Sequence, residues 1–509
     1  MDLLSILAPM PIIWLIAELS FFRKNGSTLE ACTRTLVIAV ILAVVVWKMP
    51  INDIISASFE GVVMSLWPIS TVIVAAVFLY DICNTTGNIQ YIRDTLASVS
   101  KDRRVLVLLV AWGFGGFIEG IAGFGTSIAI VASMLTALGF SPFLSAALAL
   151  VANPISSVFG SLGVQMPTLS QVTDLSTSDL AVYSTYVVIP VVLLTPFILV
   201  YITGKAYNIK SIFGGIWILT IVSAVSFAVP MYFVVKYINE DLTGVAGAVF
   251  SLIAMILVIS VSPRKRWSFK FFQKEKLKKQ IIAWSPFILC IVLLTVTSKL
   301  FLPIYKLLSY AKIIITISVG KQSSEYVINL LTTSIPWIFV SAFLGGKIQG
   351  LSVKQCMKIL CTTIVRMWKT IVTLIILLCI SRIMTYSGMI KEIAISLVCL
   401  TGSAYFMVVP FLGTIGAFIT GSATSANVLL GSLQVTAADE LGKNPSLFMA
   451  FSIVGGTIGK MMSPQNIAVG LNAAQIAGQE SKMFRELIKW YILYLLVLMG
   501  LSIVANAIY

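Results

Sequence analysis

The sequence has no histidine, and charged residues account for only 11% of its 509 positions. Histidine is the commonest proton shuttle and metal ligand, so any proton transfer in this protein must fall to carboxylates, lysines or water. No nucleophile paired with a base is visible in the chain either. The composition therefore argues against an enzyme and against a bound metal or other cofactor, and we predict none of these.

Cysteines and acidic residues are also few. The seven cysteines are scattered, odd in number and without metal-ligand spacing, so we interpret them as small core residues. The 35 Lys and Arg outnumber the 20 acidic residues, for a net charge of +15. Because most of these basic residues stand in short loops beside apolar runs, they indicate the charge bias of a membrane protein and not a nucleic-acid partner.

Long apolar runs, by contrast, are abundant. Hydrophobic residues make up 58% of the chain and the mean hydropathy is +1.00, which is typical of a polytopic membrane protein surrounded by lipid. No basic residue precedes the first run and Arg23 and Lys24 follow it, which argues against a cleaved signal and for an outside amino terminus. A spanning helix needs about 20 apolar residues, and this length predicts about twelve spans, at 3–22, 33–50, 59–81, 142–167, 180–204, 212–236, 243–262, 281–301, 330–346, 370–388, 446–475 and 487–508.

Two further apolar stretches, at 104–140 and 403–441, are each long enough for two arms. The segment Pro263–Gln280 carries eight Lys or Arg and one Glu, so we expect it in the cytoplasm. Counting crossings from this segment predicts that both stretches return to the side they left, from opposite faces, and that both termini lie outside. Counting alone leaves open whether the arms cross the membrane fully or only dip into it, and the glycine-rich tip with Glu119 beside it favours dipping. We therefore expect an all-α membrane protein with two re-entrant hairpins in inverted repeats.

Matching motifs in the two halves support the repeats. Phe117–Gly120 recurs as Phe418–Gly421, and Leu138–Pro142 recurs as Leu441–Pro445. A bundle with two glycine-rich packing helices is the alternative. We assign 1–204 to the first repeat, with its hairpin at 104–140 and a broken helix at 142–167. Residues 205–280 form connecting helices and the basic loop. The second repeat is 281–509, with its hairpin at 403–441 and a broken helix at 446–475.

The tip of the first hairpin combines glycines, hydroxyls and a carboxylate. Glycines let the backbone turn and approach a ligand, and the helix that begins near Thr126 offers free N–H groups to an anion. We predict that the tip binds substrate through Gly123, Gly125, Thr126 and Ser127. Glu119 stands beside them at membrane depth, so it is either paired or the group that carries a proton.

The tip of the second hairpin has hydroxyls and an amide where the first has a carboxylate. Such side chains hydrogen-bond a carboxylate and a hydroxyl, or coordinate a hard cation through oxygen. We predict substrate binding by Ser422, Thr424, Ser425 and Asn427. An N-cap role for Ser425 explains part of this cluster but not its density.

Two interrupted helices complete the predicted site. Asn153–Pro154 is expected to break the first, and Gly455–Thr457 the second. Lys460 would then lie about 15 residues into the membrane, too deep to reach the surface, and needs an anionic partner: Glu119, a backbone terminus or the carboxylate of a substrate. Further predicted substrate-binding residues here are Asn153, Ser463 and Gln465.

Other charged residues within apolar runs are less informative. Arg382 is either functional or reaches the nearby surface with its long side chain. Glu18, Glu60 and Asp81 stand near the ends of spans, and we interpret them as interfacial.

At these motifs the chain resembles the lactate permease family, bacterial transporters of lactate and glycolate, which is similar to the broader ion transporter superfamily. The resemblance covers nearly the whole chain. It implies uptake of L-lactate, with D-lactate and glycolate as further substrates, by proton symport across the bacterial plasma membrane, and it suggests an elevator-like movement. The motifs that carry it are Asp102–Arg104, FGGFIEGIAGFGTS at 114–127, Leu138–Pro142, Asn153 with Phe159–Gly163, Phe411–Gly413, Thr420–Asn427 and Gly459–Gln465.

Three positions depart from the family pattern. Ala423, Ala426 and Ser127 stand where family members commonly carry Asp, Ser and Pro. Loss of the tip aspartate leaves Glu119 as the candidate proton carrier, or it changes the coupling or the substrate. A sodium-coupled carboxylate transporter of the same fold, a channel and a non-transporting receptor stay as alternatives, and the sequence does not decide between a monomer and a homodimer.

Overall fold

The computed structural model describes residues 3–18, 28–97, 99–123, 125–261, 274–298, 300–320, 322–476 and 478–508. These residues are mostly helical, because an apolar segment that meets no water must satisfy its backbone hydrogen bonds within itself. The amino-terminal part contains α1 (Leu3–Leu7), α2 (Met10–Ala17), α3 (Thr28–Val45), α4 (Ile51–Met64), η2 (Ser65–Ser70), α5 (Thr71–Thr85), α6 (Asn88–Ala97), α7 (Arg103–Val107), η3 (Leu108–Phe114), α8 (Gly115–Ile121), α9 (Thr126–Ala137), α10 (Pro142–Ser157), α11 (Gly160–Gly163), α12 (Gln165–Thr173) and α13 (Thr177–Ala206).

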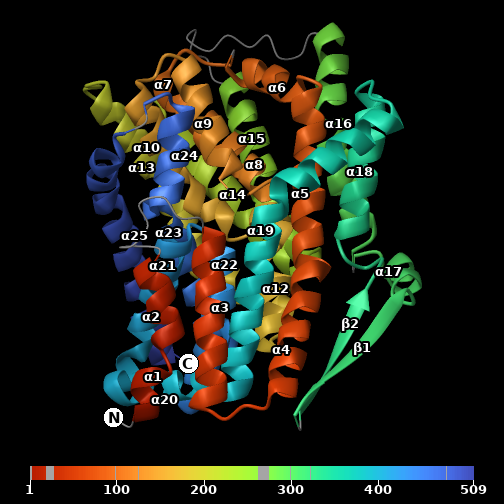
Figure 1. Ribbon diagram of the computed structural model, residues 1–509. Coiled ribbons are helices and arrows are strands. Elements are labelled where there is room, and N and C mark those ends of the chain that lie inside the picture. The colour runs from red at the N-terminus through yellow and green to blue at the C-terminus, as the bar shows by residue number, and fades with distance from the viewer. Residues whose placement is uncertain are drawn as a thin grey trace.

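The rest of the chain continues in the same manner, and the helices stand side by side along one long axis (Figure 1). The middle part contains α14 (Trp217–Tyr237), η4 (Glu240–Leu242), α15 (Thr243–Val261), α16 (Lys274–Val296), α17 (Leu302–Leu308), β1 (Lys312–Val319), β2 (Gln322–Asn329) and α18 (Ile335–Ile348). The carboxy-terminal part contains α19 (Val353–Ser387), α20 (Met389–Thr401), η5 (Gly402–Ala404), α21 (Tyr405–Thr420), α22 (Ala423–Glu440), α23 (Pro445–Met462), α24 (Pro464–Ala473) and α25 (Glu480–Ile508).

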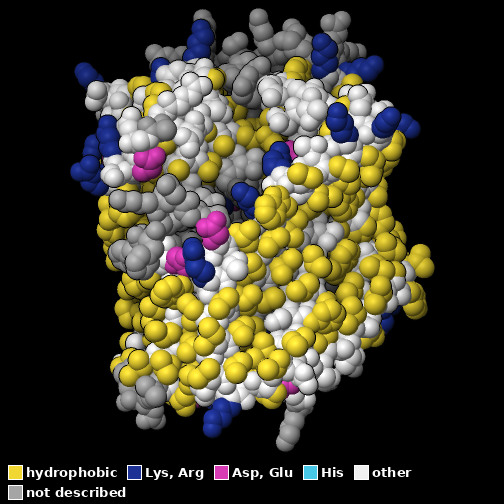
Figure 2. Space-filling model, in the orientation of Figure 1, with side chains coloured by type: hydrophobic (Ala, Val, Ile, Leu, Met, Phe, Trp, Pro, Cys, Tyr) yellow, Lys and Arg dark blue, Asp and Glu magenta, His cyan; other side chains and the backbone are white. Residues whose placement is uncertain are grey.

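Nine helices in the described part of the chain are long and apolar enough to cross a membrane, or ten with α23 and α24 counted as one bent span. Some of the expected spans are short: α18 has only 14 residues, and α1 and α2 are separate short helices. Figure 2 shows hydrophobic side chains over the lower and right-hand part of one face, whereas Lys and Arg gather mostly near its upper end. The protein is thus a multi-pass membrane protein by the length and composition of its helices.

The prediction of an all-α protein is wrong in one place. Strands β1 and β2 pair antiparallel, in a register that runs from Lys312 opposite Asn329 to Val319 opposite Gln322. A run of β-branched residues in β1, KIIITISV, favours a strand over a helix. The hairpin lies beside α4 (Figure 1), where the backbone N–H of Gly320 donates to Asp53 Oδ1 at 3.0 Å.

The first broken helix is interrupted later than predicted. Asn153 and Pro154 lie inside α10, which continues to Ser157. The break comes at Phe159 to Gly163, where Ser161 and Leu162 have φ of 51° and 54°. Pro154 removes only one backbone donor, and the helix continues because its residues are packed on all sides. The Ser157 carbonyl at the end of α10 is instead satisfied by the Gln165 side chain, at 2.9 Å.

The second broken helix is also interrupted elsewhere. Gly455–Thr457 lies inside α23, and the chain bends by 50° between α23 and α24. A Cβ on Gly455 would stand 2.1 Å from the Pro410 carbonyl oxygen, so this glycine serves close contact with α21 and not a break. The bend falls at Ser463, which is extended (ψ 137°) because the following Pro464 disfavours a helical conformation before it.

A candidate substrate cavity between two helix turns

Both predicted hairpins turn at glycines in the left-handed conformation. Between α8 and α9, Gly123 has φ of 55° and Gly125 has φ of 80°, and between α21 and α22, Gly421 has φ of 72°. A Cβ on Gly123 would stand 2.1 Å from Ser161 Oγ, so α11 packs directly on this turn. The predicted site requires that 104–140 and 403–441 are each interrupted. Both are interrupted, the first between α8 and α9 and the second between α21 and α22.

A cavity of about 350 Å³ lies between the two turns. It is bounded by the first turn, the break after α10, the second turn, and the junction of α23 with α24, while α3 and α19 close the remaining side. Its lining residues are Leu29, Cys32, Glu119, Gly123, Ser157, Gly160, Ser161, Val164, Gln165, Lys369, Thr370, Thr373, Leu374, Leu377, Thr420, Gly421, Ser422, Ala423, Thr424, Ser425, Lys460, Gln465, Asn466 and Val469.

A buried ion pair stands in the wall of this cavity. Lys460 Nζ lies 2.7 Å from Glu119 Oε1, and the two side chains are only 7% and 1% exposed. Ser157 lies between them: its hydroxyl donates to Glu119 Oε1 at 2.6 Å and accepts from Lys460 Nζ at 2.9 Å. Of the three partners that the sequence leaves open for Lys460, the structure therefore has Glu119. Removing either partner of such a pair leaves a buried charge uncompensated, at a cost of about 3–5 kcal/mol.

Two buried oxygen atoms near the ion pair accept no hydrogen bond from the described residues. Glu119 Oε2 and Gln165 Oε1 are both buried and have no hydrogen-bond partner among the described residues. Both residues line the cavity. Buried polar atoms are normally satisfied, so these two oxygens can accept hydrogen bonds from a polar ligand in the cavity.

The second turn is held by the junction of α23 and α24. Asn466 Nδ2 donates to the carbonyl oxygens of Gly421 and Lys460, both at 3.0 Å, and to Ser463 Oγ at 2.8 Å. Our sequence-based site residues do not include Asn466. Its position just after a Ser-Pro pair, where a helix begins, was the available signal.

About half of the predicted site residues line the cavity. These are Glu119, Gly123, Ser422, Thr424, Ser425, Lys460 and Gln465. The others, Gly125, Thr126, Ser127, Asn153, Asn427 and Ser463, lie outside its lining, several of them in contacts that shape the turns and breaks. Ser127 donates to the Gly115 carbonyl at 2.9 Å, and Asn427 Oδ1 accepts from Ser452 at 3.1 Å. Asn153 Oδ1 lies 3.1 Å from the Ser157 hydroxyl oxygen.

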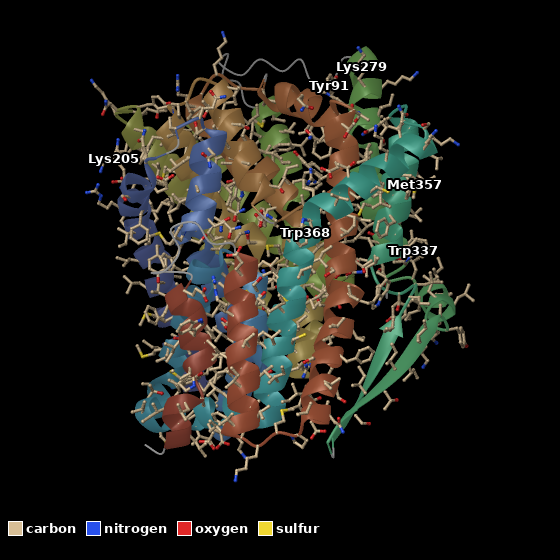
Figure 3. All side chains as sticks on the ribbon, in the orientation of Figure 1. Tyr91, Lys205, Lys279, Trp337, Met357 and Trp368 are labelled. Atoms are coloured by element: carbon tan, nitrogen blue, oxygen red, sulfur yellow. The ribbon has the colours of Figure 1, made fainter. Side chains whose placement is uncertain are left out.

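The wall formed by α19 is absent from the sequence-based site. Lys369 precedes the predicted span at 370–388 by one residue, and the sequence-based site therefore does not include it. In the structure α19 runs for 35 residues from Val353, so Lys369 lies near its middle, and Figure 3 labels its neighbour Trp368 partway along this helix.

Other buried charges are also paired. Arg382 Nε on α19 lies 3.2 Å from Glu60 Oε1 on α4, and the two side chains are 6% and 0% exposed. Arg382 also donates to the Gln171 carbonyl of α12. Glu60 is thus buried inside the helix bundle, where the charge of Arg382 neutralises it. Asp81 is likewise buried, and it accepts from Arg366 and from Thr363, both at 2.6 Å.

No cluster of three or more His, Cys, Asp or Glu able to hold a metal ion occurs within the residues that the structure describes. The cavity therefore offers hydroxyls, an amide, a lysine and one carboxylate–lysine pair. Such a set recognises a small polar anion through charge and hydrogen bonds.

The chain is similar to known proteins over most of its length. The chain is 39% identical to L-lactate permease of Streptococcus iniae over 442 residues, covering 87% of this chain and 92% of the relative. It is 30% identical to the glycolate permease GlcA of Escherichia coli, covering 97% and 94%. Among solved structures, the YdaH transporter of Alcanivorax borkumensis matches with a TM-score of 0.48 at 14% identity, covering 98% and 97%, which is too distant for a conclusion about the fold.

The family model described as L-lactate permease matches residues 4–508, nearly the full chain. The chain belongs to the L-lactate permease family.

Proposed function

We propose that this protein takes up L-lactate, with D-lactate and glycolate as further substrates, by proton symport across the bacterial plasma membrane. The observation that carries the proposal is the buried pair of Glu119 and Lys460 in the wall of a polar cavity. Membership of the permease family and the names of the relatives, L-lactate permease and glycolate permease, support transport over an enzymatic role.

The pair provides a way to couple a proton to an anion. While Glu119 is charged it occupies Lys460, because the two atoms are 2.7 Å apart. Protonation of Glu119 removes this partner, and the ammonium group of Lys460 is then available to the carboxylate of the substrate. Proton and monocarboxylate together add no net charge to the site, so their joint binding avoids an uncompensated charge at membrane depth.

The hydroxyls of the second turn face the same cavity. Thr424 and Ser425 line it together with the Gln465 amide, so the 2-hydroxyl of lactate or glycolate has donors and acceptors on that side. Asn427, by contrast, is fully buried away from the lining. We therefore assign the hydroxyl of the substrate to Thr424 and Ser425.

The transport movement follows from two turns placed against two broken helices. We propose that 1–204 and 281–509 are inverted repeats, joined by 205–280, whose hairpins at 104–140 and 403–441 are re-entrant and move together with the site as an elevator. In Figure 1, α8 and α9 lie above α21 and α22, which supports opposite entry of the hairpins.

The orientation in the membrane is part of the same proposal. Both chain termini lie in the lower part of Figure 1, and Figure 3 labels Lys205 and Lys279 toward the upper end. Lysines at the upper end support a cytoplasmic position for that end and an outside position for both termini.

A sodium-coupled carboxylate transporter is the second candidate. The observation that favours it is the density of hydroxyl oxygens at the second turn, where Thr420, Ser422, Thr424 and Ser425 all line the cavity. Hard cations are bound by such oxygens.

Uptake of radiolabelled L-lactate into proteoliposomes separates the two candidates. A pH gradient, alkaline inside, is imposed without sodium, and a sodium gradient is imposed separately at equal pH. We expect accumulation above equilibrium with the pH gradient alone. Accumulation that follows sodium at fixed pH, with no response to the pH gradient, would overturn proton coupling.

A further inference from the structure

The charges that line the cavity do not cancel. Among the described residues, three charged side chains line it: the carboxylate of Glu119 and the ammonium groups of Lys460 and Lys369. Glu119 and Lys460 neutralise each other within one ion pair. The cavity therefore carries one net positive charge while Glu119 is ionised, and Lys369 is the residue that supplies it.

The surroundings of Lys369 leave this charge available. No acidic side chain within the described residues forms a salt bridge with Lys369, and the nearest recorded partner of its Nζ is the Trp368 ring, with 5.9 Å to the ring centroid. Lys369 is exposed to the cavity and not packed away. On the same helix, Thr370 and Thr373 also line the cavity and add hydroxyl groups to that wall.

The location of Lys369 explains why such a charge is tolerated. Lys369 is exposed and lies where the basic first half of α19, which also carries Lys354, Lys358 and Arg366, meets the apolar half that follows. A charged side chain at the end of an apolar segment can face water, and Lys369 does so on the side of the cavity that residues of α3 and α19 line. A lysine placed there without a protein partner is suited to attract an anion.

We infer that Lys369 is the residue that attracts the carboxylate of the substrate and makes the cavity selective for anions. This inference rests on the proposed function and deepens it, because it gives the two lysines different roles. Lys369 acts on the substrate while Glu119 still occupies Lys460. Lys460 becomes available to the same carboxylate only when Glu119 is protonated.

The effect of Lys369 is expected to be moderate. For two unit charges on the order of 10 Å apart, at an effective dielectric constant of about 20, Coulomb's law corresponds to a factor of roughly ten in affinity. A neutral analogue of the substrate gains nothing from this charge. The charge preference of the site, and not only its affinity, therefore reports on Lys369.

The test is equilibrium exchange of labelled L-lactate in proteoliposomes without any gradient, with neutral lactamide as a competing ligand. The variants are Lys369→Gln, Lys369→Arg and, as a matched control on the same helix, the exposed Lys358→Gln, which does not line the cavity. We expect Lys369→Gln to raise the half-saturating lactate concentration about tenfold and to leave inhibition by lactamide unchanged. Lys369→Arg and Lys358→Gln should stay near the wild type.

Three outcomes would overturn the inference. If Lys369→Gln exchanges lactate like the wild type, the lysine has no role in binding, although the proposed function stands. If Lys369→Gln weakens lactate and lactamide equally, the lysine supports the shape of the site and not its charge. If the wild type shows no saturable lactate exchange, the proposed function fails first, and the inference fails with it.

Discussion

The two turns that face each other across the cavity have the same backbone design and different chemistry. Each follows a helix that ends at a glycine with positive φ, Gly123 in one and Gly421 in the other. The first turn is next to a carboxylate that is paired with Lys460 from the other half of the chain. The second carries only hydroxyls and is held by Asn466. From this difference we expect the first turn to interact with charged groups through Glu119 and the second turn to form hydrogen bonds through its hydroxyls.

The largest expected effect comes from removing the charge at the first turn. Glu119→Gln cannot carry the coupled proton, and it leaves Lys460 permanently without its partner. We expect accumulation of lactate under a pH gradient to fall to simple equilibration, while exchange without a gradient persists. Proteoliposome uptake measures both. The surface carboxylate Glu486, paired with Lys489, supplies the control Glu486→Gln, and undiminished accumulation in Glu119→Gln would refute the role of Glu119.

The next comparison concerns the two glycines. An alanine in the left-handed conformation costs about 1–2 kcal/mol at either turn. At Gly123 the added Cβ would also stand 2.1 Å from Ser161 Oγ, whereas at Gly421 its nearest neighbour is the flexible end of Gln465, at 2.5 Å. We therefore expect Gly123→Ala to lower the thermal unfolding temperature in detergent more than Gly421→Ala does. Equal shifts would mean that the first turn is not packed against α11 as described.

A smaller effect is expected from the amide that supports the second turn. Asn466→Ala removes the donor to the Gly421 carbonyl, which costs about 1–3 kcal/mol if that group is left unsatisfied, whereas the Lys460 carbonyl keeps the Ser463 backbone N–H as a donor. We expect reduced thermal stability and weaker lactate binding. The exposed Asn472 on the same helix gives the matched control Asn472→Ala. A similar loss in both variants would show that α24 as a whole is sensitive and that this contact is not special.

The smallest effect is expected from one hydroxyl of the second turn. Thr424→Val keeps the shape of the side chain but removes its hydrogen-bonding group, a loss of about 1 kcal/mol or roughly fivefold in affinity. We expect lactate to lose this factor relative to propionate, which has no hydroxyl, in competition for exchange. An unchanged ratio of lactate to propionate would mean that Thr424 does not contact the hydroxyl of the substrate.

Much of the site was predictable because local chemistry marks it. Glycine beside polar residues in an apolar stretch predicts a turn, and both turns occur at the predicted positions, Gly123 and Gly421. The depth of Lys460 required an anionic partner, and Glu119 was among the candidates. The choice between candidates depends on the packing of segments 341 residues apart, which no local pattern encodes.

The breaks were harder to predict, since one residue type serves two purposes. Glycines in Gly455–Thr457 were expected to interrupt a helix, but they allow α23 to pack closely against α21. Pro154 likewise remains inside α10. The free-energy cost of a glycine or proline in a helix depends on the local sequence, whereas the packing energy that a glycine allows depends on the neighbouring helix. Whether the helix breaks depends on the sum of these two energies.

The sequence by itself determined that this is a membrane protein of apolar helices with two polar turns, because hydropathy, charge bias and glycine placement act locally. Only the tertiary structure decided that Glu119 forms an ion pair with Lys460 and that Lys369 lines the same cavity. These relations depend on how distant helices pack, and packing is a property of the whole chain, since each helix is positioned by the neighbours that surround it.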